Sequence, residues 1–537
     1  MDLLHQRLRT AAFWEKLAFW LLLALHLLPL WNHRYFLTSD GPAHLYNAAL
    51  LRAMLLHPDN WAHQLLTINF NPEPNYLSHL LLVGLLTVAP PWLADKLVLT
   101  LYVVGLPLAL RYLLRAVRPD AGWLAVLGFP FVYSVVLVWG FYNFCLSLAI
   151  FLWAVGYWLR QAKVGWSLRS IVALAILLGI LFTAHPLPYL VSGLLLGLLA
   201  LSAAAQQRSW VVAGRALGVL LLAYLPTLPL LWWYFRVKGT AASTPPSNYA
   251  ESFWAWLRLE PLHYFGSAEG SYRWLIAGLF GLLGLVASWQ VRRGAAGRPA
   301  LPWLLTGLLL LGAYVALPDA IAGGSVIKPR WALLSYLILL GALATVPYPP
   351  RVRQVALGLG ALVASLFLIF RWQKFEVFQA GLAEYRSALP YLRPNASLLA
   401  LNYADVSQVP GGPELGTYLP LFTHASGQLG AEVPLFCYEN YEAITGYFPL
   451  TWRRGKMPLE EFSHFPPYLQ PVLYEPAFVP DYLLLWGRIV ATPGKMQSPA
   501  NAARVADYLR QYHYQLRFRS PAGLLELYER PIPRALP

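Results

Sequence analysis

Charged residues are scarce in this chain of 537 residues: Lys, Arg, Asp and Glu together make up only 12% of it, and hydrophobic residues make up 58%. Soluble globular chains carry about 25% charged residues, so a protein that is mostly exposed to water is excluded. The composition is typical of a polytopic membrane protein. Its 22 Trp and 31 Tyr fit helix ends that lie at the level of the lipid headgroups.

Cysteine is almost absent, and acidic residues are few in the first two thirds of the chain. The two cysteines, Cys145 and Cys437, give neither a metal-binding spacing nor a disulfide framework. The net charge of +15 belongs to residues 1–372, because residues 373–537 hold 14 basic and 14 acidic residues. We interpret the excess as basic cytoplasmic loops. A nucleic-acid-binding surface is the weaker interpretation, and no nucleic-acid partner is expected.

Long apolar runs dominate the rest of the sequence. The first run follows basic residues and ends at Trp31 with no small-residue cleavage site after it, which predicts an uncleaved anchor. Runs of roughly 17–25 residues cross a bilayer. Eleven spans are predicted, near residues 13–31, 93–112, 121–139, 141–159, 170–186, 188–205, 212–235, 273–291, 300–318, 330–347 and 353–372. The run at 77–89 is too short to cross, so we expect it at the membrane interface.

Clusters of Lys and Arg follow every second predicted span, so all of them lie on one side of the membrane if residues 77–89 do not cross. By the positive-inside rule that side is cytoplasmic, which places the N-terminus inside and the C-terminus outside. The loops and turns that then share the outer face are residues 32–92, 139–143, 185–186, 236–272 and 328–330.

Residues 373–537 differ from the apolar part and are predicted to form a soluble extracytoplasmic α/β domain. Apolar runs at 397–401, 482–486 and 524–528 predict strands, and residues 502–511 predict a helix. The expected fold is therefore a polytopic α-helical membrane domain over residues 1–372, with about 11 transmembrane helices, followed by this α/β domain.

The first polar stretch after the first apolar run, Thr-Ser-Asp-Gly-Pro-Ala-His at residues 38–44, contains the leading catalytic candidate, Asp40. The outer loops hold few acids, and His44 follows Asp40 by four residues on the same helical face, which suits a carboxylate base with a histidine partner. The alternative is structural, because Asp40 before Gly41-Pro42 is also a typical helix N-cap. A divalent cation at Asp40 with His44 or Glu260 stays open, since two scattered ligands do not define a metal site.

Lys328 and Arg330 stand at the outer start of a predicted span, where two cations suit a lipid phosphate. The alternative is that they are ordinary helix-end cations that reach toward water. The remaining candidates are the polar residues of the outer turns and loops, which are predicted to line a substrate cavity beside Asp40: Tyr142, Asn143, His185, Glu260 and His263.

The layout resembles the GT-C superfamily of membrane glycosyltransferases, which includes protein O-mannosyltransferases and aminoarabinose transferases. The matching features are the acidic motif that opens a long first outer loop (Ser39 to His44), the basic-aromatic pair Arg330-Trp331 at a late span, and an outer C-terminal domain. The resemblance implies that Asp40 acts as catalytic base, and that Arg330, helped by Lys328, contacts the phosphate of a polyprenyl-phosphate donor. Many relatives carry two adjacent acids in this loop, whereas here Gly41 follows Asp40.

These features predict an inverting glycosyltransferase that moves a sugar from a polyprenyl-phosphate carrier to a lipid, glycan or protein acceptor on the outer face, in a bacterial inner membrane. Two rivals belong to other classes: a transporter or flippase, and a non-catalytic assembly or receptor protein. A polysaccharide polymerase or ligase with a diphosphate-linked donor is the nearest alternative among enzymes. The sequence specifies neither the sugar, the acceptor nor the oligomeric state.

Overall fold

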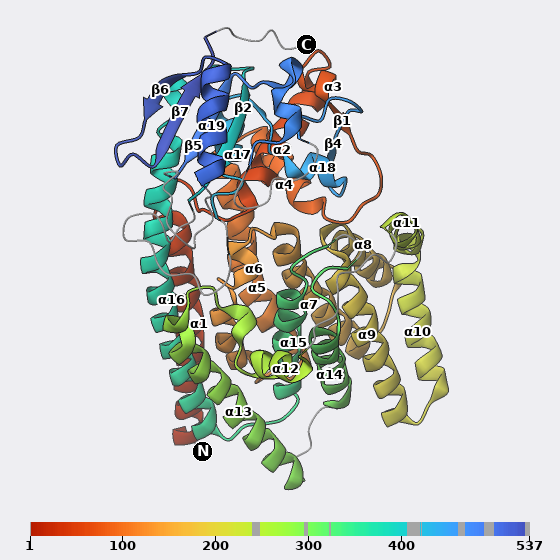
Figure 1. The fold of residues 1–537 in the computed structure, drawn as a ribbon. Coiled ribbons are helices and arrows are strands. Elements are labelled where there is room, and N and C mark those ends of the chain that lie inside the picture. Colours follow the sequence, from red (N-terminus) through yellow and green to blue (C-terminus); the bar gives the residue numbers. More distant parts are fainter. Residues whose placement is uncertain are drawn as a thin grey trace.

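A computed structural model describes residues 2–238, 248–294, 299–321, 324–404, 419, 421–459, 468–487 and 499–531 of the chain, with the backbone alone for residues 2–12, 499 and 500. The molecule is mostly helical, with a smaller region that contains a β-sheet near the C-terminus. Figure 1 shows the long helices in the lower part and the sheet above them, while the N-terminus lies at the opposite end from the sheet.

Seven helical segments of the described chain are long and apolar enough to cross a membrane, which marks the chain as a membrane protein. They lie in α1 (Asp2–Trp31), α5 (Pro91–Val117), α7 (Tyr142–Val164), α9 (Pro186–Gln207), the segment from α10 (Trp210–Tyr224) through η2 (Leu225–Thr227) to α11 (Leu228–Lys238), the segment from η4 (Ser267–Glu269) through α13 (Gly270–Arg292), and α16 (Pro350–Arg386). The side of the membrane that each end faces stays a prediction.

The expected count of eleven spans is not confirmed. Residues 121–139 are not one membrane helix but a 3-10 helix, η1 (Gly122–Phe131), and a single turn, α6 (Val135–Val138). Pro130 within η1 cannot donate a backbone hydrogen bond, and the whole segment is buried among other helices. Three other predicted spans are helices of 16 or 17 residues: α8 (Leu168–Ala184), α14 (Leu301–Ala316) and α15 (Lys328–Leu343).

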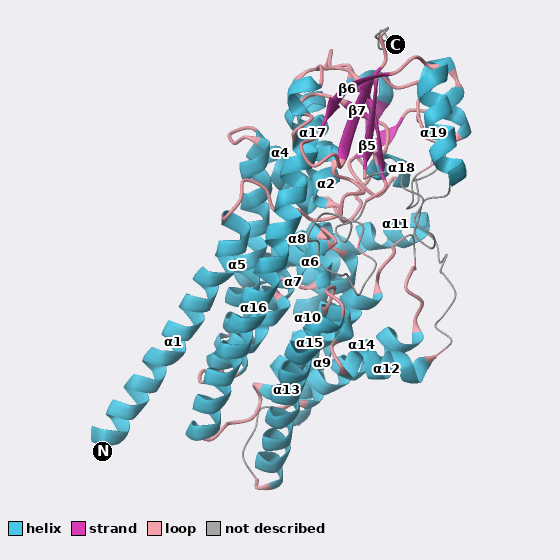
Figure 2. Ribbon diagram, turned by 60° about the vertical axis from the view of Figure 1, so that its left-hand side comes forward, coloured by secondary structure: helices cyan, strands magenta, loops and turns pink. Residues whose placement is uncertain are grey.

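The predicted domain boundary at residue 372 falls inside α16, which continues for 37 residues without a break. At 1.5 Å per residue this helix is roughly 55 Å long, and a bilayer core is only about 30 Å thick. Its C-terminal part therefore extends beyond the membrane-spanning part and reaches the sheet (Figure 1). Figure 2 shows the strands together at one end of the long helices. The side chain of Arg371, in α16, is buried and paired with Glu269 at 2.8 Å.

The predicted strands of the C-terminal region are present. One five-stranded sheet has the order β3-β2-β5-β7-β6, where β2 pairs in parallel with β3 and β5, and β7 pairs antiparallel with β5 and β6. Its strands are β2 (Ser397–Asn402), β3 (Phe436–Cys437), β5 (Tyr482–Trp486), β6 (Gln515–Arg519) and β7 (Leu525–Glu529). Strands β2 and β5 are buried along their whole length, as their continuous apolar sequences require.

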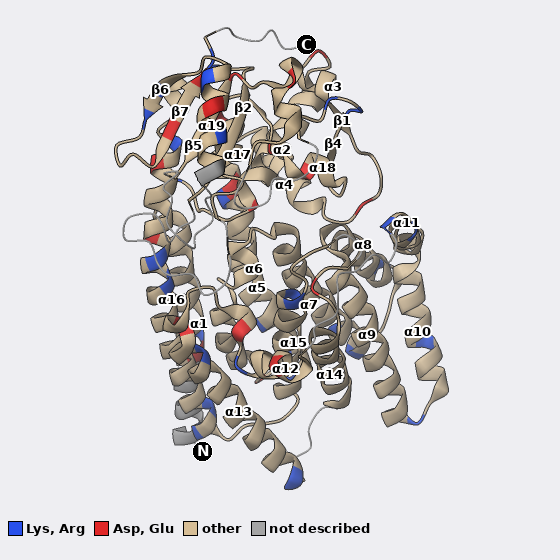
Figure 3. Ribbon diagram, viewed as in Figure 1, with Lys and Arg blue, Asp and Glu red and all other residues tan. Residues whose placement is uncertain are grey.

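Short helices complete the region around the sheet. They are α17 (Ser426–Glu432), α18 (Tyr441–Thr445) and α19 (Pro499–Gln511), with the 3-10 turns η5 (Leu389–Tyr391), η7 (Pro471–Tyr474) and η8 (Pro476–Phe478). Charged residues of both signs lie in this region, whereas basic residues mark the ends of several helices at the opposite side of the molecule (Figure 3).

The predicted first outer loop, residues 32–92, is folded against the C-terminal region. It forms α2 (Gly41–Leu56), α3 (Ala62–Leu65), strand β1 (Leu66–Ile68) and α4 (Leu77–Leu86), and β1 pairs antiparallel with β4 (Leu450–Trp452). Helix α4 has 10 residues, so the apolar run at 77–89 is indeed too short to cross. Glycines allow α17 to approach α2 closely: a Cβ on Gly427 would lie 2.4 Å from the Pro42 oxygen, and one on Gly430 would lie 2.7 Å from the Tyr46 ring.

The second long loop contains α12 (Tyr249–Leu257) and η3 (Glu260–Leu262), which lie against α15. Trp256 donates a hydrogen bond from Nε1 to the Ser335 hydroxyl (2.7 Å), and the Tyr336 hydroxyl donates to the Trp256 carbonyl (2.7 Å). This loop is thereby attached to one turn of α15.

Candidate functional site

The Asp40 loop is held by a tight turn between α6 and α7. The Ser39 and Asp40 amides donate to the carbonyls of Val138 and Trp139, both at 2.9 Å. Gly140 follows with a φ of +88°, and a Cβ at this position would lie 2.7 Å from the Asp40 nitrogen. Only glycine fits such a backbone position without displacement, so this turn fixes where Asp40 stands.

Asp40 occupies the N-cap position of α2, yet its side chain makes no capping hydrogen bond among the described residues. The Thr38 hydroxyl accepts the hydrogen bond from the Gly41 amide instead (3.1 Å). Asp40 thus occupies the N-cap position that the sequence predicts, but its side chain does not supply the capping hydrogen bond. The carboxylate is left for other interactions.

The carboxylate of Asp40 faces residues of the C-terminal region. The Tyr441 hydroxyl donates a hydrogen bond to it, and His424 Nε2 lies 3.8 Å from its Oδ1. Burial lowers the pKa of His424 to about 3, so this contact involves a neutral imidazole and is not an ion pair. Burial raises the pKa of Asp40 to about 7, although the nearby charges of His44 and Arg330 oppose the rise.

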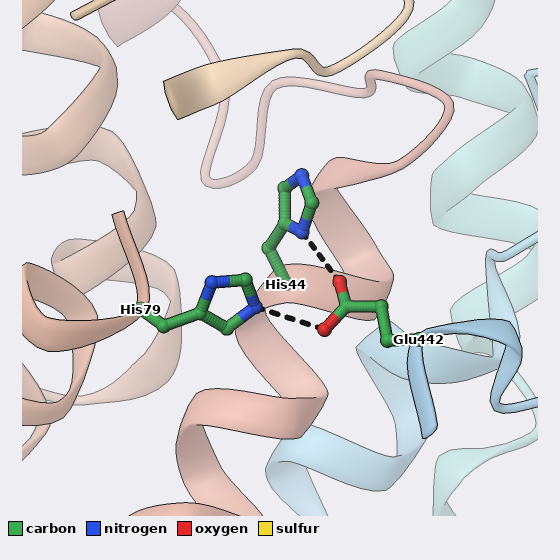
Figure 4. A group of neighbouring side chains, drawn as sticks. All are labelled: His44, His79 and Glu442. Atoms are coloured by element: carbon green, nitrogen blue, oxygen red, sulfur yellow. Dashed lines mark hydrogen bonds and ion pairs between the residues drawn. The ribbon is translucent and has the colours of Figure 1, made fainter. Parts of the chain in front are cut away.

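His44, the expected partner of Asp40, belongs to a buried group with His79 of α4 and Glu442 of α18 (Figure 4). Its Nδ1 lies 2.5 Å from Glu442 Oε1, and His79 Nε2 lies 2.8 Å from Glu442 Oε2. The side chains of His79 and Glu442 are fully buried, and that of His44 is only 4% exposed. Three segments that are far apart in the sequence thus meet at one carboxylate.

Both ring nitrogens of His44 face acceptors, because Nε2 lies 3.0 Å from the Gly140 carbonyl. Burial alone would lower the pKa of His44, but the Glu442 carboxylate raises it above its usual value. Burial would likewise raise the pKa of Glu442, yet His79 and His44 lower it to about 2. The two histidines and the Glu442 carboxylate thus form one buried hydrogen-bonded group.

Arg330 and His185 form the second part of the site. Arg330 Nη1 lies 3.3 Å from His185 Nε2, and the guanidinium stacks 4.1 Å from the centre of the Phe141 ring. His185 Nδ1 accepts a hydrogen bond from the Leu187 amide (3.1 Å), so Nε2 carries the ring proton. Burial, and then the charge of Arg330, hold the pKa of His185 well below its usual value. With this tautomer, the contact between Arg330 Nη1 and His185 Nε2 joins two donors.

Arg330 has a further unsatisfied donor. Its Nε is buried and has no hydrogen-bond partner within the described part of the chain. Buried polar groups are normally hydrogen-bonded, and a bound ion or water is one explanation for an unpartnered one. An anionic oxygen between Arg330 and His185 would accept from both side chains.

Lys328 does not join Arg330. Its Nζ lies 3.2 Å from the Ser252 hydroxyl and 5.5 Å from the centre of the Tyr314 ring, toward α12 and α14. Residues two apart on a helix point to different faces, which is why neighbouring cations in the sequence have separate surroundings here.

Glu260 and His263 are not brought to Asp40 by any contact among the described residues. Glu260 pairs with Arg258 (3.3 Å), and His263 Nδ1 donates to the Glu260 carbonyl (2.6 Å). Both belong to the loop that packs against α15, so the described part of the structure gives no contact that would bring Glu260 to a cation at Asp40, which the sequence had left open.

Tyr142 and Asn143 lie beside the Asp40 loop, where they position other groups. The Tyr142 hydroxyl donates to Asp95 Oδ1 (2.9 Å) and lies 3.2 Å from the Thr38 hydroxyl. The Asn143 side chain accepts from the Ser78 amide (2.7 Å) and donates to the Asn75 carbonyl (2.6 Å), which ties the start of α4 to α7.

Sequence reasoning missed five residues of this site: His79, Asp95, His424, Tyr441 and Glu442. Their local patterns are weak, because His79 lies in an apolar run and Glu442 ends a mixed stretch of acids and aromatics at residues 438–442. No spacing within the sequence connects these residues. They become recognisable only when the first loop packs on the C-terminal region.

Comparison with known proteins adds no relative: no protein-family model matches the sequence, and no curated protein matches it.

Proposed function

We propose that this chain is a membrane glycosyltransferase of the GT-C type, which moves a sugar from a polyprenyl-phosphate carrier to an acceptor hydroxyl. The observation that carries the proposal is a carboxylate, Asp40, near the donors of Arg330 and His185. The Phe141 ring, on which Arg330 stacks, directly follows Gly140, which packs on the Asp40 backbone, so a base and an anion-binding group lie near each other. A bacterial inner membrane, with the site on its outer face, is the location that we propose for it.

The donors around Arg330 suit a phosphate. Its guanidinium is planar, rests on Phe141, and presents several N–H groups in a fixed arrangement that matches phosphate oxygens. One phosphate oxygen placed between Arg330 and His185 would accept from both and remove the donor-donor contact at 3.3 Å. The position of these groups near the start of α15 also suits a lipid-linked phosphate, because the surrounding helices are apolar.

In the proposed reaction, Asp40 removes the proton from the acceptor hydroxyl as its oxygen attacks the anomeric carbon of the donor sugar. The bond from that carbon to the phosphate oxygen breaks, and the phosphate leaves with the bonding electron pair. Arg330 and His185 stabilise the negative charge that develops on it. The Tyr441 hydroxyl, which donates to Asp40, fixes the direction of the carboxylate.

The two cations at the start of α15 have different roles in this proposal. Arg330 holds the donor phosphate, whereas Lys328 contacts the Ser252 hydroxyl of α12. Lys328 is therefore a matched control, a cation of the same helix end that is two residues away.

The first test is mass spectrometry of lipids that co-purify with the full chain and with its Arg330→Ala and Lys328→Ala variants. We expect a polyprenyl phosphate, free or glycosylated, on the wild type and on Lys328→Ala, and its depletion on Arg330→Ala. Bulk phospholipid alone on all three proteins would refute the donor class and favour a transporter or a non-catalytic receptor.

The second test uses the donor that the first identifies. Loss of a general base typically costs on the order of a hundred- to ten-thousand-fold in rate, so Asp40→Asn should keep donor binding and lose turnover by that factor. Turnover at the wild-type rate in this variant would remove Asp40 from the catalytic role.

A further inference from the structure

His44, His79 and Glu442 bring two imidazoles and a carboxylate together, and we propose that they bind one zinc ion that joins the first outer loop to the C-terminal region. The inference is independent of the proposed transferase activity. It differs from the metal site that the sequence left open, at Asp40 with His44 or Glu260.

The donor set carries the proposal. Two imidazole nitrogens and a carboxylate oxygen are a common zinc ligand set, with bonds of about 2.0–2.2 Å. The three ligand atoms lie within 4.8 Å of one another, on α2, α4 and α18. Ligand atoms around a tetrahedral ion are separated by roughly 3–3.5 Å. The contacts at 2.5 and 2.8 Å are to different oxygens of Glu442, Oε1 and Oε2. Ion binding therefore requires these contacts to open and both imidazole nitrogens to turn toward one ion at the carboxylate.

The surroundings of His44 match those of a metal-bound histidine. Such a residue usually donates its second ring N–H to a carbonyl or carboxylate, which fixes the ring orientation. His44 Nε2 faces the Gly140 carbonyl at 3.0 Å and leaves Nδ1 directed at Glu442. An ion at Nδ1 would take the place of the proton that this nitrogen now carries, so binding would release that proton.

The local charge also favours a dication. Besides Glu442, the carboxylates of Asp40 and Asp95 act electrostatically on His44. Asp95 Oδ2 is buried and has no hydrogen-bond partner among the residues that the structure describes. Lys96, the neighbour of Asp95, donates its hydrogen bond to the His33 carbonyl. A zinc ion would add positive charge beside these acidic groups.

The positions of His44, His79 and Glu442 in the fold indicate a structural role for the ion. The first outer loop supplies His44 and His79, and Glu442 is the third ligand, from the C-terminal region. A shared ion would hold the two parts together close to Asp40, with Tyr441 next to Glu442 in α18. Bound zinc is therefore expected to stabilise the folded chain.

The test is the metal content of the full chain, purified in detergent with an affinity tag that contains no histidine and then measured by elemental mass spectrometry. We expect about one zinc per chain in the wild type, loss after treatment with a chelator, and recovery when Zn²⁺ is added. The His79→Ala and Glu442→Gln variants should bind at least ten-fold less. His263→Ala, which alters a histidine outside the group, should bind as the wild type does.

Thermal unfolding of the chelator-treated wild type with and without added Zn²⁺ gives a second measurement, so the test does not depend on the variants folding. The unfolding temperature should rise with Zn²⁺ for the wild type and for His263→Ala, and stay constant for Glu442→Gln. A folded wild type that binds no zinc after reloading would overturn the proposal and leave the hydrogen-bonded group of Figure 4 as it stands. Equal binding by Glu442→Gln and the wild type would overturn it as well. Neither result depends on transferase activity.

Discussion

Replacing Gly140 by alanine tests whether the turn between α6 and α7 positions the Asp40 loop. The new Cβ would lie 2.7 Å from the backbone nitrogens of both Asp40 and Gly41, and 3.1 Å from the Asp40 Cα. These are backbone atoms, so rotation of a flexible side chain does not relieve the contact. The residue also has a φ of +88°, which an L-residue with a side chain rarely adopts.

The expected cost has two parts. The left-handed backbone conformation costs an alanine about 1–2 kcal/mol, and overpacking in a fixed environment adds typically about 1–3 kcal/mol. Gly455→Ala is the matched control, because Gly455 has a φ of +71° and no atom within 4 Å of an added Cβ. The control should therefore show only the first part, and the difference between the variants isolates the contact with the Asp40 loop.

The assay is thermal unfolding of the purified chain, followed by measurement of bound lipid and zinc. We expect Gly140→Ala to unfold at a lower temperature than Gly455→Ala. It should also bind less zinc, because the Gly140 carbonyl is the acceptor that orients His44. If the two variants unfold at the same temperature and bind the same amount of zinc, the turn does not hold the Asp40 loop, and the reasoning about Gly140 is wrong.

Two further predictions concern buried charges away from Asp40. Burial raises the pKa of Glu439 to about 7, from about 4.5 in the unfolded chain, so its contribution to stability is greatest below pH 4.5 and is lost as the pH rises through 7. The free energy of unfolding of Glu439→Gln should thus exceed that of the wild type above pH 7, by up to roughly 3 kcal/mol. This difference should disappear toward pH 4.5. A difference that is the same at pH 5 and pH 8 would contradict the prediction. Glu269→Gln leaves the buried Arg371 guanidinium without its carboxylate and should destabilise the chain by about 3–5 kcal/mol. A double variant that also carries Arg371→Met should recover part of this loss in thermal unfolding, and a loss equal to the sum of both single changes would refute the pairing.

Local patterns were enough to predict much of the fold. Apolar runs predicted the long helices, and the strands at 397–402 and 482–486 were recognisable because they are continuous apolar stretches. The prediction failed at residues 121–139, where the composition is apolar but the chain forms a buried 3-10 segment with Pro130 inside it. High hydropathy indicates only that a segment is removed from water, and it does not distinguish lipid from the interior of a protein.

The candidate site was only partly accessible from the sequence. Asp40 and His44 stand out because they share a helix face, and Arg330 stands out as a cation at the start of an apolar helix. The residues that contact them lie far away in the sequence: Glu442, which contacts His44, is 398 residues from it. Lys328, two residues from Arg330, lies among different groups.

The sequence by itself determined that the chain is a membrane protein with a distinct C-terminal region, because composition and the length of apolar runs depend only on neighbouring residues. The tertiary structure alone decided which groups surround Asp40. Glycines at 427 and 430 let α17 approach α2, and this contact brings His44 to the region that contains Glu442. The charge state of a buried group depends on such neighbours, since removal from water is offset only by partners that the fold supplies.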